Sequence, residues 1–118
     1  MTVQKIATLL DARVVVADDL GTEIHSACGS DLMSDVLAFV KDRTVLLTGL
    51  INPHVIRTAE MLDITCIVFT RGKVPAEDLA DMAKARGIAI LTTRHTLYLA
   101  CGILYQHGLA GCERRQEA

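Results

Sequence analysis

The stretch that decides the fold is Cys66-Ile67-Val68-Phe69-Thr70-Arg71-Gly72-Lys73, an apolar run that passes into a short polar loop. The same pattern occurs earlier in Val45-Leu46-Leu47-Thr48-Gly49 and later in Ile88-Ala89-Ile90-Leu91-Thr92-Thr93, and a segment with helical spacing follows each time. Strands that are apolar on both faces are typical of parallel sheets covered by helices. Short strand–helix–strand connections form right-handed crossovers. We therefore predict an α/β fold, a three-layer α/β/α sandwich with a mostly parallel sheet.

Capping residues and apolar spacing predict the elements around these strands. Helix caps, first-turn prolines and stop glycines mark the helix ends, at Thr2, Ser30, Asn52, Pro53, Pro75, Gly87 and Gly108. We expect helices over residues 2–11, 30–40, 53–62, 75–86 and 95–107. We expect strands over residues 13–17, 44–48, 65–70 and 88–92, and a short edge strand over residues 23–27.

The composition indicates one small domain with surplus apolar surface. The chain has 118 residues, of which 51% are hydrophobic, with two Tyr, two Phe and no Trp. A chain of this length has room for one core, so we expect a single domain over residues 1–112 and a polar, disordered tail over residues 113–118. Surplus aliphatic surface on a small domain is commonly covered by a second copy, and we therefore expect a homodimer.

The charge pattern excludes some partners. A formal net charge of -2 gives no basic field for a nucleic-acid backbone, and the few aromatic residues give no stacking platform. No apolar run reaches the roughly 18 residues that suggest a membrane span. The amino terminus lacks the apolar core and cleavage site of a signal peptide. We expect a cytoplasmic protein that binds neither nucleic acid nor membrane.

The four cysteines, Cys28, Cys66, Cys101 and Cys112, match no common metal-binding pattern, since no two are spaced as C-x-x-C. Cys66 falls in an expected buried strand and Cys101 in an expected helix, where a free cysteine commonly acts as a small hydrophobic residue. Cys28, beside a glycine, and Cys112, near the tail, are candidates for exposed, reactive thiols. We expect four free thiols, no bound metal and no cofactor.

The polar ends of the three strands predict a binding site. The carboxyl ends of parallel strands lie at one edge of the sheet, where ligands of open α/β sheets bind. Basic side chains beside a glycine offer charge and close backbone approach to a phosphate. This edge would bring together Thr48, Gly49, Asn52, Arg71, Gly72, Lys73 and Thr93, with Arg94 next to them. We predict that these residues bind a small anion or a nucleotide phosphate.

The alternative reading of the loop over residues 70–73 is a solvated turn whose charges keep the sheet edge soluble. The loop is not a Walker A motif, which would require glycine at the position of Ile67 and serine or threonine at the position of Val74. The loop after Thr48 contains only one glycine, so its resemblance to a phosphate loop is weak. The residues alone do not decide between an anion-binding loop and a solvated turn.

Residue types that are common in active sites also have simpler readings. His54 and His95 fall in the first turns of expected helices, where a neutral ring suits ligand binding or acid–base catalysis, although surface histidines are more common. Asp31 and Asp35 lie one turn apart on an expected helix, and we assign them to its dipole rather than to a cation site. No serine or cysteine has a recognisable nucleophile motif. We expect no catalytic activity of the chain's own.

Several phrases of the sequence, in order and spacing, resemble the DRTGG domain family. They are Ser30-Asp31-Leu32-Met33-Ser34-Asp35-Val36-Leu37, Val45-Leu46-Leu47-Thr48-Gly49, Val55-Ile56-Arg57-Thr58-Ala59-Glu60, Ile67-Val68-Phe69-Thr70-Arg71-Gly72-Lys73 and Ile90-Leu91-Thr92-Thr93. The resemblance extends from Val3 to Leu109. It departs at Asp42-Arg43-Thr44, which Val45 and Leu46 follow instead of two glycines, so we carry no binding role onto those three residues.

The resemblance implies a fold similar to the amino-terminal domain of HPr kinase/phosphorylase. It also implies a regulatory role and dimer contacts, since such domains accompany CBS modules in some pyrophosphatases and precede the catalytic part of some phosphotransacetylases. The function that we favour is a stand-alone regulatory or sensor domain that binds a small anionic metabolite or nucleotide.

Three other functions remain open. The first is an interaction module that docks a partner enzyme without a ligand. The second is a small phosphoryl-transfer or hydrolytic enzyme that uses His54 or His95. The third is a cysteine-ligated redox or iron–sulfur accessory protein.

Overall fold

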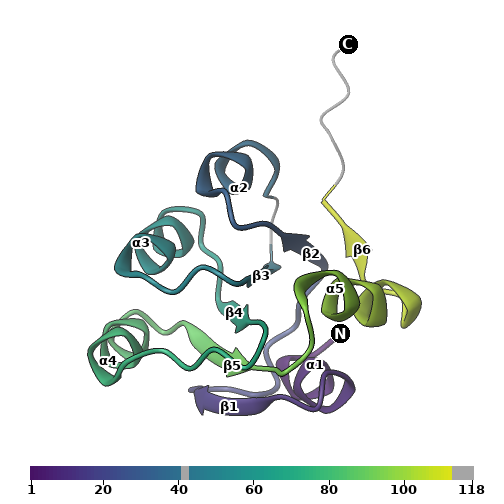
Figure 1. The fold of residues 1–118 in the computed structure, drawn as a ribbon, viewed down its shortest axis with the longest axis horizontal. Helices are drawn as coiled ribbons and strands as arrows, with labels where there is room; N and C mark the ends of the chain where they lie inside the picture. The colour runs from purple at the N-terminus through teal and green to yellow at the C-terminus, as the bar shows by residue number, and fades with distance from the viewer. Residues whose placement is uncertain (41–42, 113–118) are drawn as a thin grey trace.

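The chain alternates helices and strands, and the computed structural model describes them for residues 1–40 and 43–112 (Figure 1). The helices are α1 (Val3–Leu9), α2 (Met33–Phe39), α3 (Pro53–Met61), α4 (Glu77–Ala85) and α5 (Leu97–Gln106). The strands are β1 (Arg13–Val16), β2 (Ser26–Gly29), β3 (Thr44–Thr48), β4 (Cys66–Phe69), β5 (Ala89–Thr92) and β6 (Ala110–Gly111). Asp42 and the expected tail over residues 113–118 lie outside the described residues.

The strands form a six-stranded sheet in the order β1-β5-β4-β3-β2-β6. Neighbouring strands from β2 to β5 are parallel, and β6 is parallel to β2. β1 is antiparallel to β5 and pairs Arg13 with Thr92. The prediction of a mostly parallel sheet is confirmed.

Helices cover both faces of this sheet (Figure 1). α1 and α5 pack on one face, and α2, α3 and α4 pack on the other. Because successive side chains of a strand point to opposite faces, β4 contributes Cys66 and Val68 to the first core and Ile67 and Phe69 to the second. The predicted three-layer α/β/α architecture is confirmed.

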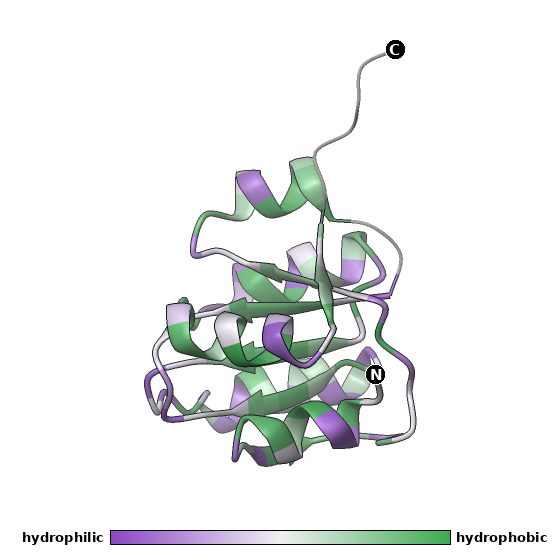
Figure 2. Cartoon of the chain, turned by 90° about the vertical axis from the view of Figure 1, so that its right-hand side faces the viewer, coloured by the Kyte–Doolittle hydropathy of each residue, from purple (hydrophilic) through white to green (hydrophobic). Residues whose placement is uncertain are grey.

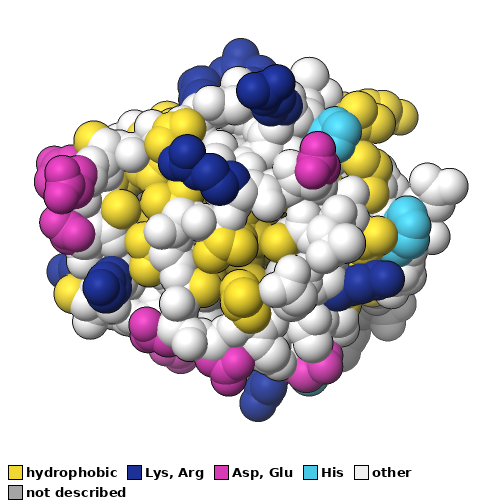
Figure 3. Space-filling model, turned by 90° about the horizontal axis from the view of Figure 1, so that it is seen from below, with side chains coloured by type: hydrophobic (Ala, Val, Ile, Leu, Met, Phe, Trp, Pro, Cys, Tyr) yellow, Lys and Arg dark blue, Asp and Glu magenta, His cyan; other side chains and the backbone are white. Residues whose placement is uncertain are grey.

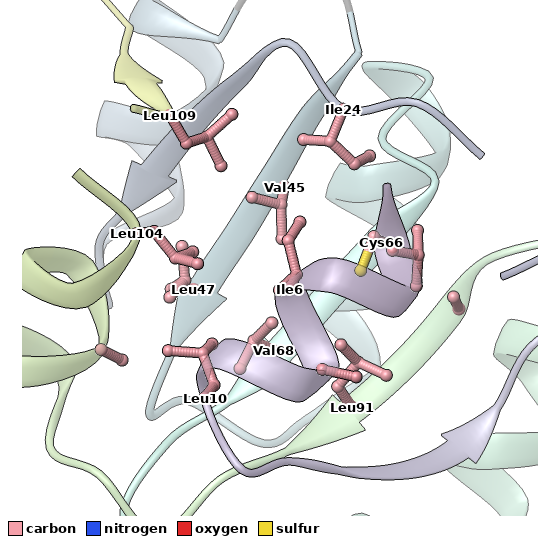
Figure 4. Packing of buried hydrophobic residues seen from close by; sticks show 14 residues of the cluster. Ile6, Leu10, Ile24, Val45, Leu47, Cys66, Val68, Leu91, Leu104 and Leu109 are labelled. Carbon is pink, nitrogen blue, oxygen red and sulfur yellow. The ribbon is translucent and has the colours of Figure 1, made fainter. Parts of the chain in front are cut away.

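Continuous apolar strands are what this arrangement requires. Figure 2 shows the central strands in hydrophobic colours between helices whose outer turns are more hydrophilic. In the first core, Ile6, Leu10 and Leu104 converge on Val45 and Val68, and all five are fully buried (Figure 4). Full burial of a large aliphatic side chain stabilises the fold by about 1.5–3 kcal/mol. The buried core therefore fixes the strands whose ends carry the polar loops.

Several helix ends lie at the predicted residues. Thr2 Oγ1 accepts a hydrogen bond from Lys5 N at 3.1 Å, and Asn52 Oδ1 accepts one from Val55 N at 3.3 Å. Gly87 follows α4 with a φ of 68°, a left-handed conformation that glycine adopts without a steric penalty. The predicted caps of α1 and α3 and the stop after α4 are confirmed.

The structure corrects the segment around β2. This strand begins at Ser26 rather than at residue 23, and it lies between β3 and β6 rather than at an edge. The two-residue strand β6, which the sequence did not predict, covers that side of β2. Ser30 does not cap α2, because its Oγ accepts a hydrogen bond from Leu32 N at 3.0 Å and forms a turn before the helix begins at Met33.

Two later helices also begin further along than expected. α4 starts at Glu77 rather than at Pro75, and α5 starts at Leu97. Thr96 caps α5, so His95 lies in the preceding loop and not in the first turn of the helix. His54 does lie in the first turn of α3, where it is exposed. None of the helices formed by residues 1–40 and 43–112 has the length and apolar character needed to cross a bilayer.

Candidate functional site

The loops after β3, β4 and β5 lie side by side at the carboxyl edge of the sheet. Thr70 N donates a hydrogen bond to Thr48 O at 3.0 Å, and Thr93 N donates one to Phe69 O at 2.9 Å. These bonds extend the parallel ladder beyond the strands and fix the order of the loops. The shared edge that the sequence predicts is therefore present, and ligand binding at this edge stays a prediction.

The loop over residues 70–73 has an unusual backbone. Arg71 and Gly72 have φ values of 58° and 69°, and a positive φ is uncommon for a residue other than glycine. Arg71 N donates to His95 O and Gly72 N donates to Thr93 O, each at 2.8 Å. These backbone groups bind the neighbouring loop and are not available to a ligand. The loop therefore presents side chains, with Arg71 exposed and Lys73 half-buried.

Two charged side chains form hydrogen bonds with the backbone of Gly49. Asp31 Oδ1 accepts hydrogen bonds from Gly49 N at 2.7 Å and from Thr48 Oγ1 at 3.0 Å. Lys73 Nζ donates to Gly49 O at 2.7 Å. The loops after β2, β3 and β4 thus form one connected network. The assignment of Asp31 to a helix dipole is wrong, because α2 begins only at Met33 and the carboxylate lies in the loop before it.

Polar groups from the loops after β2 and β4 lie close to Gly49, in the loop after β3. A Cβ atom at this glycine would lie 3.5 Å from each of Arg71 Nη2, Asp31 Oδ1 and Thr70 Oγ1. Thr70 is 0% exposed, and its hydroxyl hydrogen-bonds to no residue in the described part of the chain. A buried hydroxyl without a partner costs about 1–3 kcal/mol, and a ligand oxygen that reached this group would offset that cost. Thr70 was missed as a site residue, although it follows β4 directly.

Like Thr48 and Lys73, two more of the predicted site residues use their side chains within the fold. The Asn52 carboxamide oxygen caps α3. Thr93 is 2% exposed, and its hydroxyl donates to Leu10 O at 2.8 Å. These residues position the edge, while the exposed cations next to the loops are Arg71 and Arg94.

None of the cysteines lies in the loops after β3, β4 and β5. Burial raises the pKa of Cys66 to about 12, as expected for a thiol in the core. The pKa of Cys28 is raised to about 11, chiefly by burial and further by the nearby Cys112, Cys101 and Asp35. Both thiols are therefore protonated at neutral pH, which disfavours reaction as thiolates. Among the described residues, no group of three or more His, Cys, Asp or Glu side chains is placed to hold a metal ion.

Comparison with known proteins bears on the fold. No protein-family model and no curated protein sequence matches the chain. Among solved structures, it is similar to the CBS and DRTGG domains of the regulatory region of Clostridium perfringens pyrophosphatase, solved with the activator diadenosine tetraphosphate. The TM-score is 0.72 at 16% sequence identity, and the match covers 89% of this chain and 46% of that one. The shared fold agrees with the one that the DRTGG resemblance implies.

Proposed function

We propose that this chain is a regulatory domain that binds a small anionic metabolite or nucleotide at the carboxyl edge of its sheet. The observation that carries the proposal is that the Thr70 hydroxyl and the Arg71 guanidinium both lie close to Gly49, whose carbonyl oxygen accepts a hydrogen bond from Lys73 Nζ. Both groups donate hydrogen bonds, and a guanidinium matches the geometry of phosphate and carboxylate oxygens. The similarity in fold to a regulatory region that binds a nucleotide activator supports the same kind of role.

Asp31 could connect the binding of an anion to a change in the loop that leads into α2. Its carboxylate lies near Arg71 and also fixes the loop after β3. An anion that binds Arg71 would lie close to this carboxylate, and like charges at short range repel. The loop that leads into α2 would then shift, and a partner protein that contacts α2 would detect the bound ligand.

A thermal-shift screen tests the proposed site. Nucleotides, phosphate esters or acyl phosphates at one hundred times their Kd should add about 2.7 kcal/mol of stability if they bind only the folded chain. For a domain of this size, this corresponds to a rise in Tm on the order of ten degrees. Replacing Arg71 and Lys73 together with alanine should abolish the rise, because both positive charges are removed.

Single variants separate binding from stability in this screen. Lys73 bonds Gly49 O, so its loss should also lower the Tm of the unliganded chain. Arg71→Ala should leave that Tm nearly unchanged, since the exposed guanidinium makes no hydrogen bond or ion pair to any residue that the structure describes. Arg57→Ala, on the exposed side of α3, is the matched control. The site is wrong if no anion stabilises the parent or if Arg71→Ala responds as strongly.

We also propose that two copies of the chain pair through α5. Tyr98, Leu99 and Tyr105 of this helix are 89%, 48% and 75% exposed, and no residue from Leu97 to Gln106 is charged. A Cβ atom at Gly102 would meet no described atom within 4 Å, so a second helix has room to approach. An uncharged face can oppose its own copy across a two-fold axis without like-charge repulsion.

A further inference from the structure

A cleft of about 480 Å³ lies on the β1 side of the loop that follows β4. Its walls come from the end of α1, the first residue of β1 and the loops after β4 and β5, and they include Asp11, Arg13, Gly72, Arg94 and His95. Arg13 reaches this position because β1 is antiparallel to β5, so that the start of β1 pairs with the carboxyl end of β5. The cleft therefore opens at the same edge of the sheet as the proposed site.

The charged groups in the cleft are mostly positive. Arg13 and Arg94 are exposed, and neither side chain makes a hydrogen bond or ion pair within residues 1–40 and 43–112. The His95 ring also lines the cleft, and Asp11 is the acidic residue of the lining. Figure 3 views the molecule from the β1 side and shows several Lys and Arg side chains gathered in the upper part of that face.

The floor of the cleft is held in place before any ligand binds. Thr93 Oγ1 donates to Leu10 O at 2.8 Å and joins the end of α1 to the end of β5. Thr92 Oγ1 donates to Lys73 O at 2.6 Å and joins the loops after β4 and β5. Gly72 has a φ of 69°, a left-handed conformation that glycine adopts without a steric penalty. A preformed cleft loses little conformational entropy on binding, which favours affinity.

We infer that this cleft binds the phosphate group of a small phosphorylated molecule. Two guanidinium groups can bond several oxygens of one phosphate, and their combined charge matches a dianion better than a single carboxylate. The volume exceeds what a phosphate needs and lies within the range of small-molecule sites, so it leaves space for an organic group. This inference rests on the proposed function, because it names the ligand class for the same sheet edge and adds Arg13 and Arg94 to the site.

Residue-resolved NMR with inorganic phosphate as the probe tests the inference. The full chain labelled with ¹⁵N is titrated at neutral pH, with chloride at equal ionic strength as the reference. We expect saturable amide shifts at Gly72, Thr93 and Arg94. Arg13→Ala and Arg94→Ala should each weaken phosphate binding about tenfold or more, Arg94→Lys should weaken it less, and Arg57→Ala should leave it unchanged. The side chains of both arginines are exposed and bond no other described residue, so the variants should keep the parent spectrum elsewhere.

The possible outcomes distinguish a failure of the cleft proposal from a failure of the proposed function. Saturable shifts that remain in Arg13→Ala and Arg94→Ala but disappear in Arg71→Ala would contradict phosphate binding in the cleft. They would still support an anion site beside Gly49. Shifts that are lost in Arg13→Ala and Arg94→Ala but kept in Arg71→Ala would support phosphate binding in the cleft. They would also show that Arg71 does not contact the phosphate. If phosphate causes no saturable amide shift, the proposal that the cleft binds phosphate is wrong. The nucleotide and ester screen would still test the proposed function independently.

Discussion

Replacing Phe69 with alanine is expected to lower the free energy of unfolding by about 3–5 kcal/mol. The ring is fully buried at the end of β4, within the core that α2, α3 and α4 cover. Densely packed neighbours close only partly around the cavity that a lost ring leaves. This loss is a large part of the roughly 5–15 kcal/mol by which native proteins are stable. Urea unfolding followed by circular dichroism at one fixed protein concentration measures it.

Phe39→Ala is the matched control for this variant. Phe39 lies on α2 and is 39% exposed, so its truncation is expected to cost roughly 0.5–1 kcal/mol. Because Thr70 follows Phe69 directly, Phe69→Ala should also reduce the anion response, and Phe39→Ala should not. Equal losses of stability in the two variants would contradict the position of β4 at the centre of the core.

The second large effect concerns assembly. Light scattering after size exclusion is expected to give about twice the chain mass of 12.8 kDa. Tyr98→Glu combined with Tyr105→Glu is expected to give the single-chain mass, because burying charge at an apolar interface costs on the order of several kcal/mol per ion. Both side chains are exposed in the single chain, so the fold should tolerate the change, and circular dichroism checks this.

Met61→Glu is the control for pairing through α5. Met61 is 72% exposed on α3, which covers the opposite face of the sheet, so the variant should keep the doubled mass. A parent chain that is monomeric at micromolar concentration would contradict the homodimer. A dimer that persists in the double tyrosine variant would place the interface elsewhere.

The sequence was most informative where one physical requirement dominates. β3, β4 and β5 are buried on both faces, so they appear as continuous apolar runs, and the polar residues after them mark the shared edge. Asn52 and Pro53 mark the start of α3 because a cap and a first-turn proline are local signals. These predictions needed no knowledge of distant contacts.

The rest of the site depends on pairing between distant parts of the chain. Arg13 joins the edge only through the antiparallel register of β1 against β5. Asp31 joins it because β2 lies beside β3, and β2 was predicted too early since its four residues show no clear alternation. Thr93 resembles a ligand-binding residue in the sequence, yet its hydroxyl bonds Leu10 O, a backbone atom 83 residues away. No local pattern contains these contacts.

A crystal structure of the chain with the compound that gives the largest rise in Tm in the anion screen would locate the bound ligand. We expect the anionic group of this compound at the carboxyl edge of the sheet, within hydrogen-bond distance of the Arg71 or Arg94 guanidinium. Binding only at another surface, such as the exposed face of α5, would show that this edge is not the site.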